Sequence, residues 1–259
     1  MPESVQSSIE FVDVVASLDE DHVGTVEIQR PPNNFFDTAL IGTLADACDA
    51  LAARGCRAVV LCAAGRHFCA GANFASKAEP VGPHLYDMAV RLFAQPLPVV
   101  AAVQGSAVGG GLGLAMAADF RVASRESRFT ANFSRLGFHH GFGLSVTLPR
   151  AVGQQAAHEL LFTGRRIGGA EAHRIGLCDR LVSSEEIRST AYALAREIAG
   201  AAPLAVRSIR ATMRRALLDE LQAALDHEKA EQDHLRTTAD FREGIKANSE
   251  RREPNFTGR

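Results

Sequence analysis

The 259-residue chain contains no tryptophan and only two tyrosines, Tyr86 and Tyr192. It also lacks a long apolar run: no stretch reaches the roughly 18 residues that a membrane-spanning helix needs. The N-terminal residues MPESVQSSIEF have neither the basic start nor the apolar core of a secretion signal. These absences predict a cytoplasmic protein that has no membrane partner.

Cysteine and charge are equally uninformative about ligands. The five cysteines are odd in number and form no C-x-x-C pair, which argues against a disulfide framework and a structural zinc site. We find no Walker motif, no G-x-G-x-x-G after a strand and no cluster with metal-ligand spacing. The formal net charge of −2 gives no electrostatic case for nucleic acid. The sequence therefore predicts no metal, no nucleic-acid partner and no separate cofactor.

The order of apolar patterns predicts an α/β protein. Alternating or continuous apolar residues indicate strands over 11–18, 25–29, 58–62, 98–103 and 120–123. Helical spacing of apolar residues indicates helices over 40–51, 84–94 and 110–118, and then over 156–162, 169–175, 185–199, 203–217 and 218–235. We expect a core of stacked β-β-α units over residues 1–200 and a helical region over 201–259.

The most informative segment is 104–116, where a strand leads into Gly109, Gly110, Gly111 and Gly113 at the start of an apolar helix. Glycine costs about 1 kcal/mol relative to alanine inside a helix, so four of them need a reason. Close approach of another group to the backbone is one reason, and tight packing of the helix on a strand is the alternative. A helix N-terminus offers free N–H groups to a negative charge.

Several segments in this order resemble the crotonase superfamily, typified by enoyl-CoA hydratases and isomerases. They cover nearly the whole chain: Arg66–Asn73, Pro98–Gly105, Gly109–Gly111, Leu161–Ile167, Ala170–Ala172, Ile175–Leu177 and Asp240–Gly244. The resemblance implies a spiral of β-β-α units whose C-terminal helices join homotrimers, often paired into hexamers. It also implies an acyl-CoA thioester as substrate, so that CoA enters as part of the substrate.

Carried over to this sequence, the resemblance places the thioester carbonyl between the backbone N–H groups of Ala72 and Gly110. The CoA contacts begin near Arg30 and Pro32, and Arg66 and Lys77 are candidate partners for its phosphates. The further substrate-binding positions are Ala70, Gly71, Asn73, Phe74, Gly109, Gly113, Phe133 and Phe138. Phenylalanines at 129, 133, 138 and 142 are typical of an apolar acyl pocket, and core packing explains them as well.

The chain departs from the family where proton transfer takes place. The two glutamates of the hydratases correspond to Gly113 and Phe133, and the acid position of some isomerases and dehalogenases corresponds to Gly141. The aspartate that often follows Ala-Gly-Ala is Asn73. None of these side chains transfers a proton near neutral pH, so hydration by a carboxylate pair is not expected.

His139 and His140 are the candidates to replace the missing acid or base, because histidine titrates near neutral pH. The alternative is that both are surface loop residues. A Cys69–His67 nucleophile pair is disfavoured, and Cys69 fits a small buried apolar residue. His227 and His234 lie seven apart, beside Glu228, in a pattern typical of a solvated helix face.

Two functions remain open at this point. The first is an enzyme of the hydratase/isomerase group that stabilises a thioester enolate with backbone donors. The second is a catalytically inactive carrier or regulator that keeps the acyl-CoA pocket. The missing acids favour the second function, whereas the prevalence of enzymes in the family favours the first, which we prefer.

Overall fold

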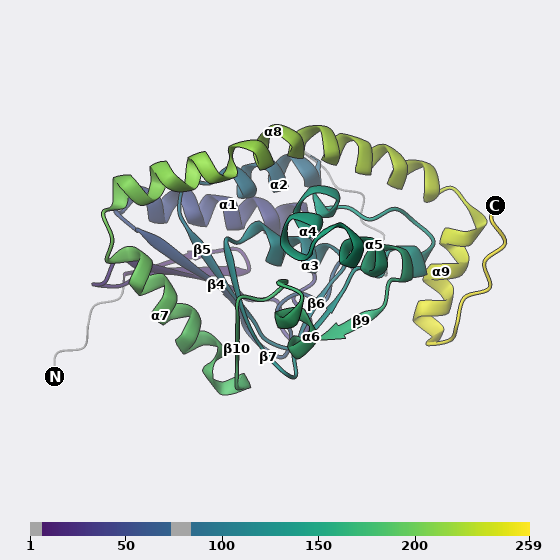
Figure 1. Ribbon diagram of the computed structural model, residues 1–259, viewed down its shortest axis with the longest axis horizontal. Coiled ribbons are helices and arrows are strands. Elements are labelled where there is room, and N and C mark those ends of the chain that lie inside the picture. The colour runs from purple at the N-terminus through teal and green to yellow at the C-terminus, as the bar shows by residue number, and fades with distance from the viewer. Residues whose placement is uncertain (1–6, 74–83) are drawn as a thin grey trace.

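A seven-stranded sheet forms the centre of the computed structural model, which describes residues 7–73 and 84–259 (Figure 1). The strand order is β1-β2-β3-β4-β5-β7-β10. The first three strands pair antiparallel, and the later neighbours pair parallel. Their bounds are β1 (Ser7–Phe11), β2 (Val14–Leu18), β3 (Val23–Ile28), β4 (Ala58–Ala63), β5 (Val99–Val103), β7 (Phe120–Ser124) and β10 (Arg180–Val182).

The continuous apolar runs of the central strands are explained by burial on both faces. In β4, Val59 and Leu61 face the main hydrophobic core, whereas Val60 and Cys62 face a second cluster. Helix α7 (Ile187–Ala199) covers that second cluster with small residues. The main core lies between the sheet and helices α1 (Thr38–Ala53), α2 (Leu85–Ala94) and α3 (Gly110–Ala117).

A smaller sheet has three strands in the order β6-β8-β9, and its strand β6 contacts α3. Its strands are β6 (Ser106–Val108), β8 (Arg128–Thr130) and β9 (Arg166–Gly168). The other helices of this part are α4 (Leu144–Val152), α5 (Gln154–Thr163) and α6 (Gly169–Arg174), with short 3-10 turns at Ser134–Leu136 and Ser184–Glu186.

The long helix α8 (Pro203–Leu235) lies along one side of the molecule and packs on α2 and α4 (Figure 1). Asp119 fixes its first half, because the Asp119 carboxylate accepts from Arg210 and Arg214, each at 2.8 Å. The predicted boundary near residue 200 falls in the turn between α7 and α8. Helix α9 (Ala239–Glu250) follows.

Two sequence-based element predictions are wrong in detail. Helices over 203–217 and 218–235 were expected, but α8 is continuous, because its buried face runs without a break through Arg214, Leu221 and Leu225 to Gln232. A strand over 11–18 was expected, but Val12 and Asp13 form the turn between β1 and β2, with Asp13 at φ 60° and Val12 79% exposed.

The predicted α/β class, with a helical region after residue 200, is confirmed. Among the described helices, we find none that is long and apolar enough to cross a membrane.

Candidate active site

The start of α3 is fixed against the segment 69–72 by backbone hydrogen bonds. Cys69 N–H donates to the Ser106 carbonyl at 3.0 Å, and Val108 N–H donates back to the Cys69 carbonyl at 3.0 Å. Gly109 N–H donates to the Thr130 carbonyl of β8 at 2.8 Å. The first residues of α3 are thereby held beside the Ala70-Gly71-Ala72 segment.

Two backbone N–H groups remain free at this junction. Phe36 N–H donates to the Gly71 carbonyl at 3.1 Å, but within residues 7–73 and 84–259 neither Ala72 nor Gly110 donates a backbone hydrogen bond. Gly110 is the first residue of α3, where the helix leaves N–H groups unpaired and its dipole is positive. Both residues line one cavity of about 910 Å³. Among the described residues, this cavity is therefore lined by two residues whose backbone N–H groups have no backbone acceptor.

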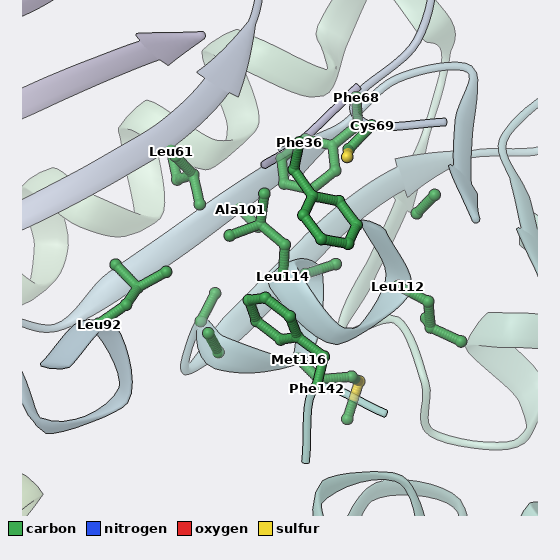
Figure 2. Packing of buried hydrophobic residues seen from close by; sticks show 14 of the residues in the cluster. Phe36, Leu61, Phe68, Cys69, Leu92, Ala101, Leu112, Leu114, Met116 and Phe142 are labelled. Atoms are coloured by element: carbon green, nitrogen blue, oxygen red, sulfur yellow. The ribbon is translucent and has the colours of Figure 1, made fainter. Parts of the chain in front are cut away.

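The glycines of α3 are needed largely because of the protein's own packing. A methyl group at Gly111 would overlap the Cys69 carbonyl oxygen, and one at Gly110 would overlap the Phe36 ring. At Gly113 a methyl group would lie 2.6 Å from Cβ of Phe142. Figure 2 shows the Phe36 and Phe142 rings beside α3, near Leu114. Tight packing, the alternative raised from the sequence, therefore explains Gly111 and Gly113, whereas Gly110 also carries a free amide.

The cavity brings together most of the predicted site. Eight of the predicted positions line it: Ala70, Gly71, Ala72, Asn73, Gly109, Gly110, Phe133 and Phe138. Arg30, Pro32, Gly113, His139 and His140 do not line it, and Phe74 and Lys77 lie outside the described residues. Arg30 instead forms ion pairs with Asp13 and Asp37, each at 2.8 Å.

Two of the positions that correspond to family acids are Gly113 and Gly141. Neighbouring side chains fill the space into which a side chain at either position would extend. The Phe142 ring fills the space beside Gly113, and Phe142 takes φ 61°, a left-handed conformation that is uncommon for a bulky residue. At Gly141 a methyl group would overlap the Tyr86 hydroxyl and lie 2.6 Å from Nε2 of Gln232. A carboxylate at either position would require these neighbours to move.

His139 and His140 form a separate polar cluster. Nε2 of His140 lies 2.8 Å from Oγ of Ser145 and 3.9 Å from Oε1 of Glu228, and the His139 ring stacks on His140 at 4.1 Å. Burial, followed by the nearby His139 and His227, lowers the pKa of His140 to about 4. His140 is therefore neutral near pH 7. Their predicted role as acid or base stays a prediction.

Glu228 corrects the expectation of a solvated face around residues 227–234. Its side chain is fully buried and accepts from Gly143 N–H at 2.8 Å, Ser145 N–H at 3.0 Å and Ser145 Oγ–H at 2.5 Å. Burial raises the pKa of Glu228. The carboxyl group thus holds the turn that carries Phe142 at the start of α4, and the sequence signal for it was the buried face of α8.

The Cys69 thiol is fully buried, and burial raises its pKa to about 12. A thiol with such a pKa stays protonated at neutral pH and is a poor nucleophile. Cys69 is therefore a small buried apolar residue, as the sequence indicated.

Sequence reasoning missed the residues that α2, α8 and α9 contribute to the cavity. Tyr86 and Gln232 line one wall, and Arg236 lies over the Phe138 and Phe241 rings at 5.5 and 5.8 Å. The described part of the lining contains five arginines and a single carboxylate, that of Glu253: the arginines are Arg135, Arg165, Arg166, Arg236 and Arg252. Three of these arginines are ion-paired: Arg135 with Glu253, Arg165 with Glu159 and Glu171, and Arg252 with Glu243 and Glu250. Arg166 and Arg236 are the other cations of this described lining, and they suit an anionic ligand.

Comparisons with known proteins identify the relatives of this chain. The profile of the enoyl-CoA hydratase/isomerase family matches residues 19–259. The chain is 38% identical over 224 residues to the probable enoyl-CoA hydratase echA12 of Mycobacterium bovis, which covers 78% of this chain and 76% of that protein. It is 31% identical over 262 residues to the 1,2-epoxyphenylacetyl-CoA isomerase of Escherichia coli, covering 96% of this chain and 100% of that protein.

Among solved structures, an enoyl-CoA hydratase/isomerase from Pseudoalteromonas atlantica superimposes with a TM-score of 0.86 at 29% identity. That match covers 95% of this chain and 100% of the other.

Proposed function

The chain belongs to the enoyl-CoA hydratase/isomerase family, and from this premise we propose that it binds an acyl-CoA thioester and stabilises its enolate at the N–H groups of Ala72 and Gly110. The observation that carries the proposal is the pair of unpaired amides on two fixed segments of the same cavity wall. Arg166 and Arg236 of the cavity lining support it further, because CoA carries phosphate groups.

The chemistry follows from where charge develops. When a proton leaves the carbon next to the thioester, the electron pair moves to the carbonyl oxygen, which becomes negative. Two fixed N–H donors are more valuable to that oxygen than to the neutral carbonyl, so they lower the barrier. Each donor of this kind contributes about 3 kcal/mol.

The reaction that we favour is an isomerisation through the enolate. Hydration by two carboxylates has little support. Phe142 fills the space beside Gly113, and Phe133 packs edge-on against Phe138 at 5.4 Å. The single carboxylate of the described lining, that of Glu253, forms an ion pair with Arg135 at 3.4 Å. A relative that matches 96% of this chain is named an isomerase. His139 and His140, the proton carriers that the sequence suggested, do not line the cavity, and their role stays a prediction; only the His139 carbonyl oxygen contacts a lining residue, by accepting from Nε2 of Gln232.

The test is exchange of the thioester α-proton. The protein is incubated with butyryl-CoA in deuterated water, and deuterium at C2 is followed by mass spectrometry. We expect exchange well above the buffer rate, since enolate stabilisation is the shared step of the proposed reactions. Tight binding without exchange would instead favour the inactive carrier. The thioether S-butyl-CoA, which lacks the carbonyl oxygen, is the matched control and should bind at least tenfold more weakly.

We also propose that the protein works in the cytoplasm as a homotrimer or hexamer. Leu204, Ile209 and Met213 leave large apolar side chains exposed on α8, by 79%, 63% and 77%. Apolar side chains gathered on one helix are typical of an interface between subunits. Light scattering of the purified protein measures the mass, and a monomer would contradict the proposal.

A further inference from the structure

The loop between β3 and α1 contacts both Ala72 and Gly110, and the proposed enolate chemistry gives it no role. Its residue Phe36 donates its N–H to the Gly71 carbonyl at 3.1 Å and pairs with Ala72 in a parallel β-bridge. The Phe36 ring lies against the first turn of α3, where a methyl group at Gly110 would overlap it (Figure 2). The position of this loop therefore sets how far apart the amides of Ala72 and Gly110 lie.

Asn34 is a buried polar residue of the same loop. Its side chain is fully buried, and its amide NH₂ group donates to two backbone carbonyl oxygens, that of Ala64 at 2.7 Å and that of His67 at 2.6 Å. The amide oxygen accepts from the Arg30 N–H at 3.0 Å. Because a carbonyl oxygen only accepts and a backbone N–H only donates, these three bonds fix the orientation of the amide. Asn34 takes φ 50°, a left-handed conformation in which asparagine is enriched.

The two carbonyl groups that hold Asn34 belong to a segment that is fixed to the large sheet. Ala64 directly follows β4, and its N–H donates at 2.8 Å to the carbonyl oxygen of Ile28, the last residue of β3. The same segment continues to Ala70, whose N–H donates to the Asn33 carbonyl at 2.8 Å. The Asn34 amide thus joins the loop between β3 and α1 to the ends of two strands, and without it two buried carbonyl groups lose their donor.

We propose that Asn34 is a positioning residue that, through Phe36, holds the N–H groups of Ala72 and Gly110 at the separation that one enolate oxygen requires. Asn34 itself does not line the cavity, so it acts without touching the ligand. This inference rests on the proposed function, because it concerns how the two amides are aligned. Fixed donors stabilise a developing negative charge only while their geometry is maintained, and a displacement of about 1 Å costs about a hundredfold in rate.

The experiment removes the amide and compares two ligands that differ in the carbonyl oxygen, butyryl-CoA and S-butyl-CoA. Asn34→Gly deletes the side chain at a left-handed position that suits glycine. Affinities for the full-length protein are measured by calorimetry, and kcat and KM of α-proton exchange are measured separately. The wild type should prefer the thioester by about tenfold or more. We expect Asn34→Gly to reduce this preference to about threefold or less and to lower kcat about a hundredfold, with S-butyl-CoA affinity kept within about twofold.

The matched control is Gln95→Ala, which removes another buried amide. Gln95 is 4% exposed and bonds both backbone groups of Leu97, at 2.6 and 2.8 Å, in the turn between α2 and β5. Its loss should lower the midpoint of urea unfolding but keep kcat and the preference for the thioester within about twofold of wild type. The comparison separates a positioning role from a purely structural one, because only the former changes the ratio of the two affinities.

Asn34→Ser keeps one hydroxyl donor and takes the place of Asn34→Gly if that variant does not fold. A smaller loss of preference and of kcat, in the same direction, is then expected. A folded variant that keeps both the wild-type preference and the wild-type kcat would overturn the inference while leaving the proposed function intact. A wild-type protein that neither exchanges the α-proton nor prefers the thioester would overturn both.

Discussion

Two walls of the same cavity differ in the kind of group that they present, main-chain amides on one and side chains on the other. The α3 wall presents main-chain amides of Ala72 and Gly110, and it depends on small residues that let segments 69–72 and 109–111 approach closely. The facing wall, around Phe133 and Gly141–Phe142, is built from side chains, and there the positions of the family's acids are taken by aromatic rings and an amide. The donors of the first wall are backbone groups, whereas the groups of the second are side chains and depend on individual residues.

This comparison shows how the reactive groups of a site can change while the fold stays the same. A backbone donor is kept by any substitution that preserves the packing around it. Here that packing requires the glycines of α3, so the donors depend on those glycines. A side-chain acid, in contrast, depends on a single residue and on the space around it. Phe142 fills the space beside Gly113, so one substitution at Gly113 cannot place an acid there without overpacking.

The largest effect is expected from forcing a carboxylate back into the facing wall. Gly113→Glu should lower the free energy of unfolding by about 4 kcal/mol, because it combines overpacking on Phe142 with a buried charge. Phe142→Gly frees that space at a left-handed position that suits glycine. Urea unfolding of both single variants and the double variant should give a favourable coupling of about 1–3 kcal/mol. A coupling near zero would show that Phe142 does not block the site.

The α3 wall is tested by Gly111→Ala. One methyl group directed at the Cys69 carbonyl should cost about 3 kcal/mol, since a backbone atom cannot move aside. Urea unfolding measures the loss. Gly200→Ala is the matched control: Gly200 has a helical φ of −71°, and an added Cβ would meet atoms no closer than 3.5 Å. If the two variants were equally stable, the close approach at α3 would not be needed.

The polar cluster that contains His140 can be tested by the pH dependence of the free energy of unfolding. His140 has a pKa of about 4 in the folded protein and about 6.5 in the unfolded chain. The unfolded state thus binds more protons between these values, so stability is complete above pH 6.5 and falls as the pH drops toward 4. His140→Gln should remove about 2 kcal/mol of that loss between pH 7 and 4.5, measured by urea unfolding.

Two features sharpen that measurement. Glu228, whose pKa burial raises, has the opposite pH dependence, and its carboxylate lies 3.9 Å from Nε2 of His140, so the difference between the two profiles reports the coupled pair. His158→Gln on α5, where the ring stacks on the exposed Phe162 at 5.1 Å, is the control and should follow the wild-type profile. An unchanged profile for His140→Gln would contradict the expected shift.

The smallest effect is expected at His139. Its Nδ1 atom lies 2.7 Å from the His140 carbonyl oxygen, and its ring does not line the cavity. His139→Ala should therefore leave the rate of α-proton exchange into butyryl-CoA within about twofold of wild type. A loss of a hundredfold or more, at unchanged stability, would instead support His139 as the proton carrier.

The frame of the molecule was predictable because its signals are local. The run Ala58–Cys62 is apolar at every position, which requires a strand buried on both faces, and that is how β4 lies. The motif around Gly109–Gly111 placed the α3 wall by resemblance, and the structure brings Ala72 and Gly110 to one cavity.

The facing wall was less predictable because it depends on long-range contacts. Tyr86 meets Gln232 although 146 positions separate them, and nothing near either residue marks the partner. Glu228 resembled a solvated residue in a charged stretch, but it is buried through hydrogen bonds to Gly143 and Ser145. Helical periodicity across the whole of α8 was the one signal that pointed inward.

Phe35 near the start of the cavity lining and Pro254 near its end belong to opposite ends of the chain. The last strand of the large sheet ends at residue 182, but α8 and α9 must also be synthesised before the cavity is complete. Nascent chains arrested between these points should lack the capacity to bind a ligand. Ligand binding is thus expected to appear only late in synthesis, when the C-terminal helices join the rest of the chain.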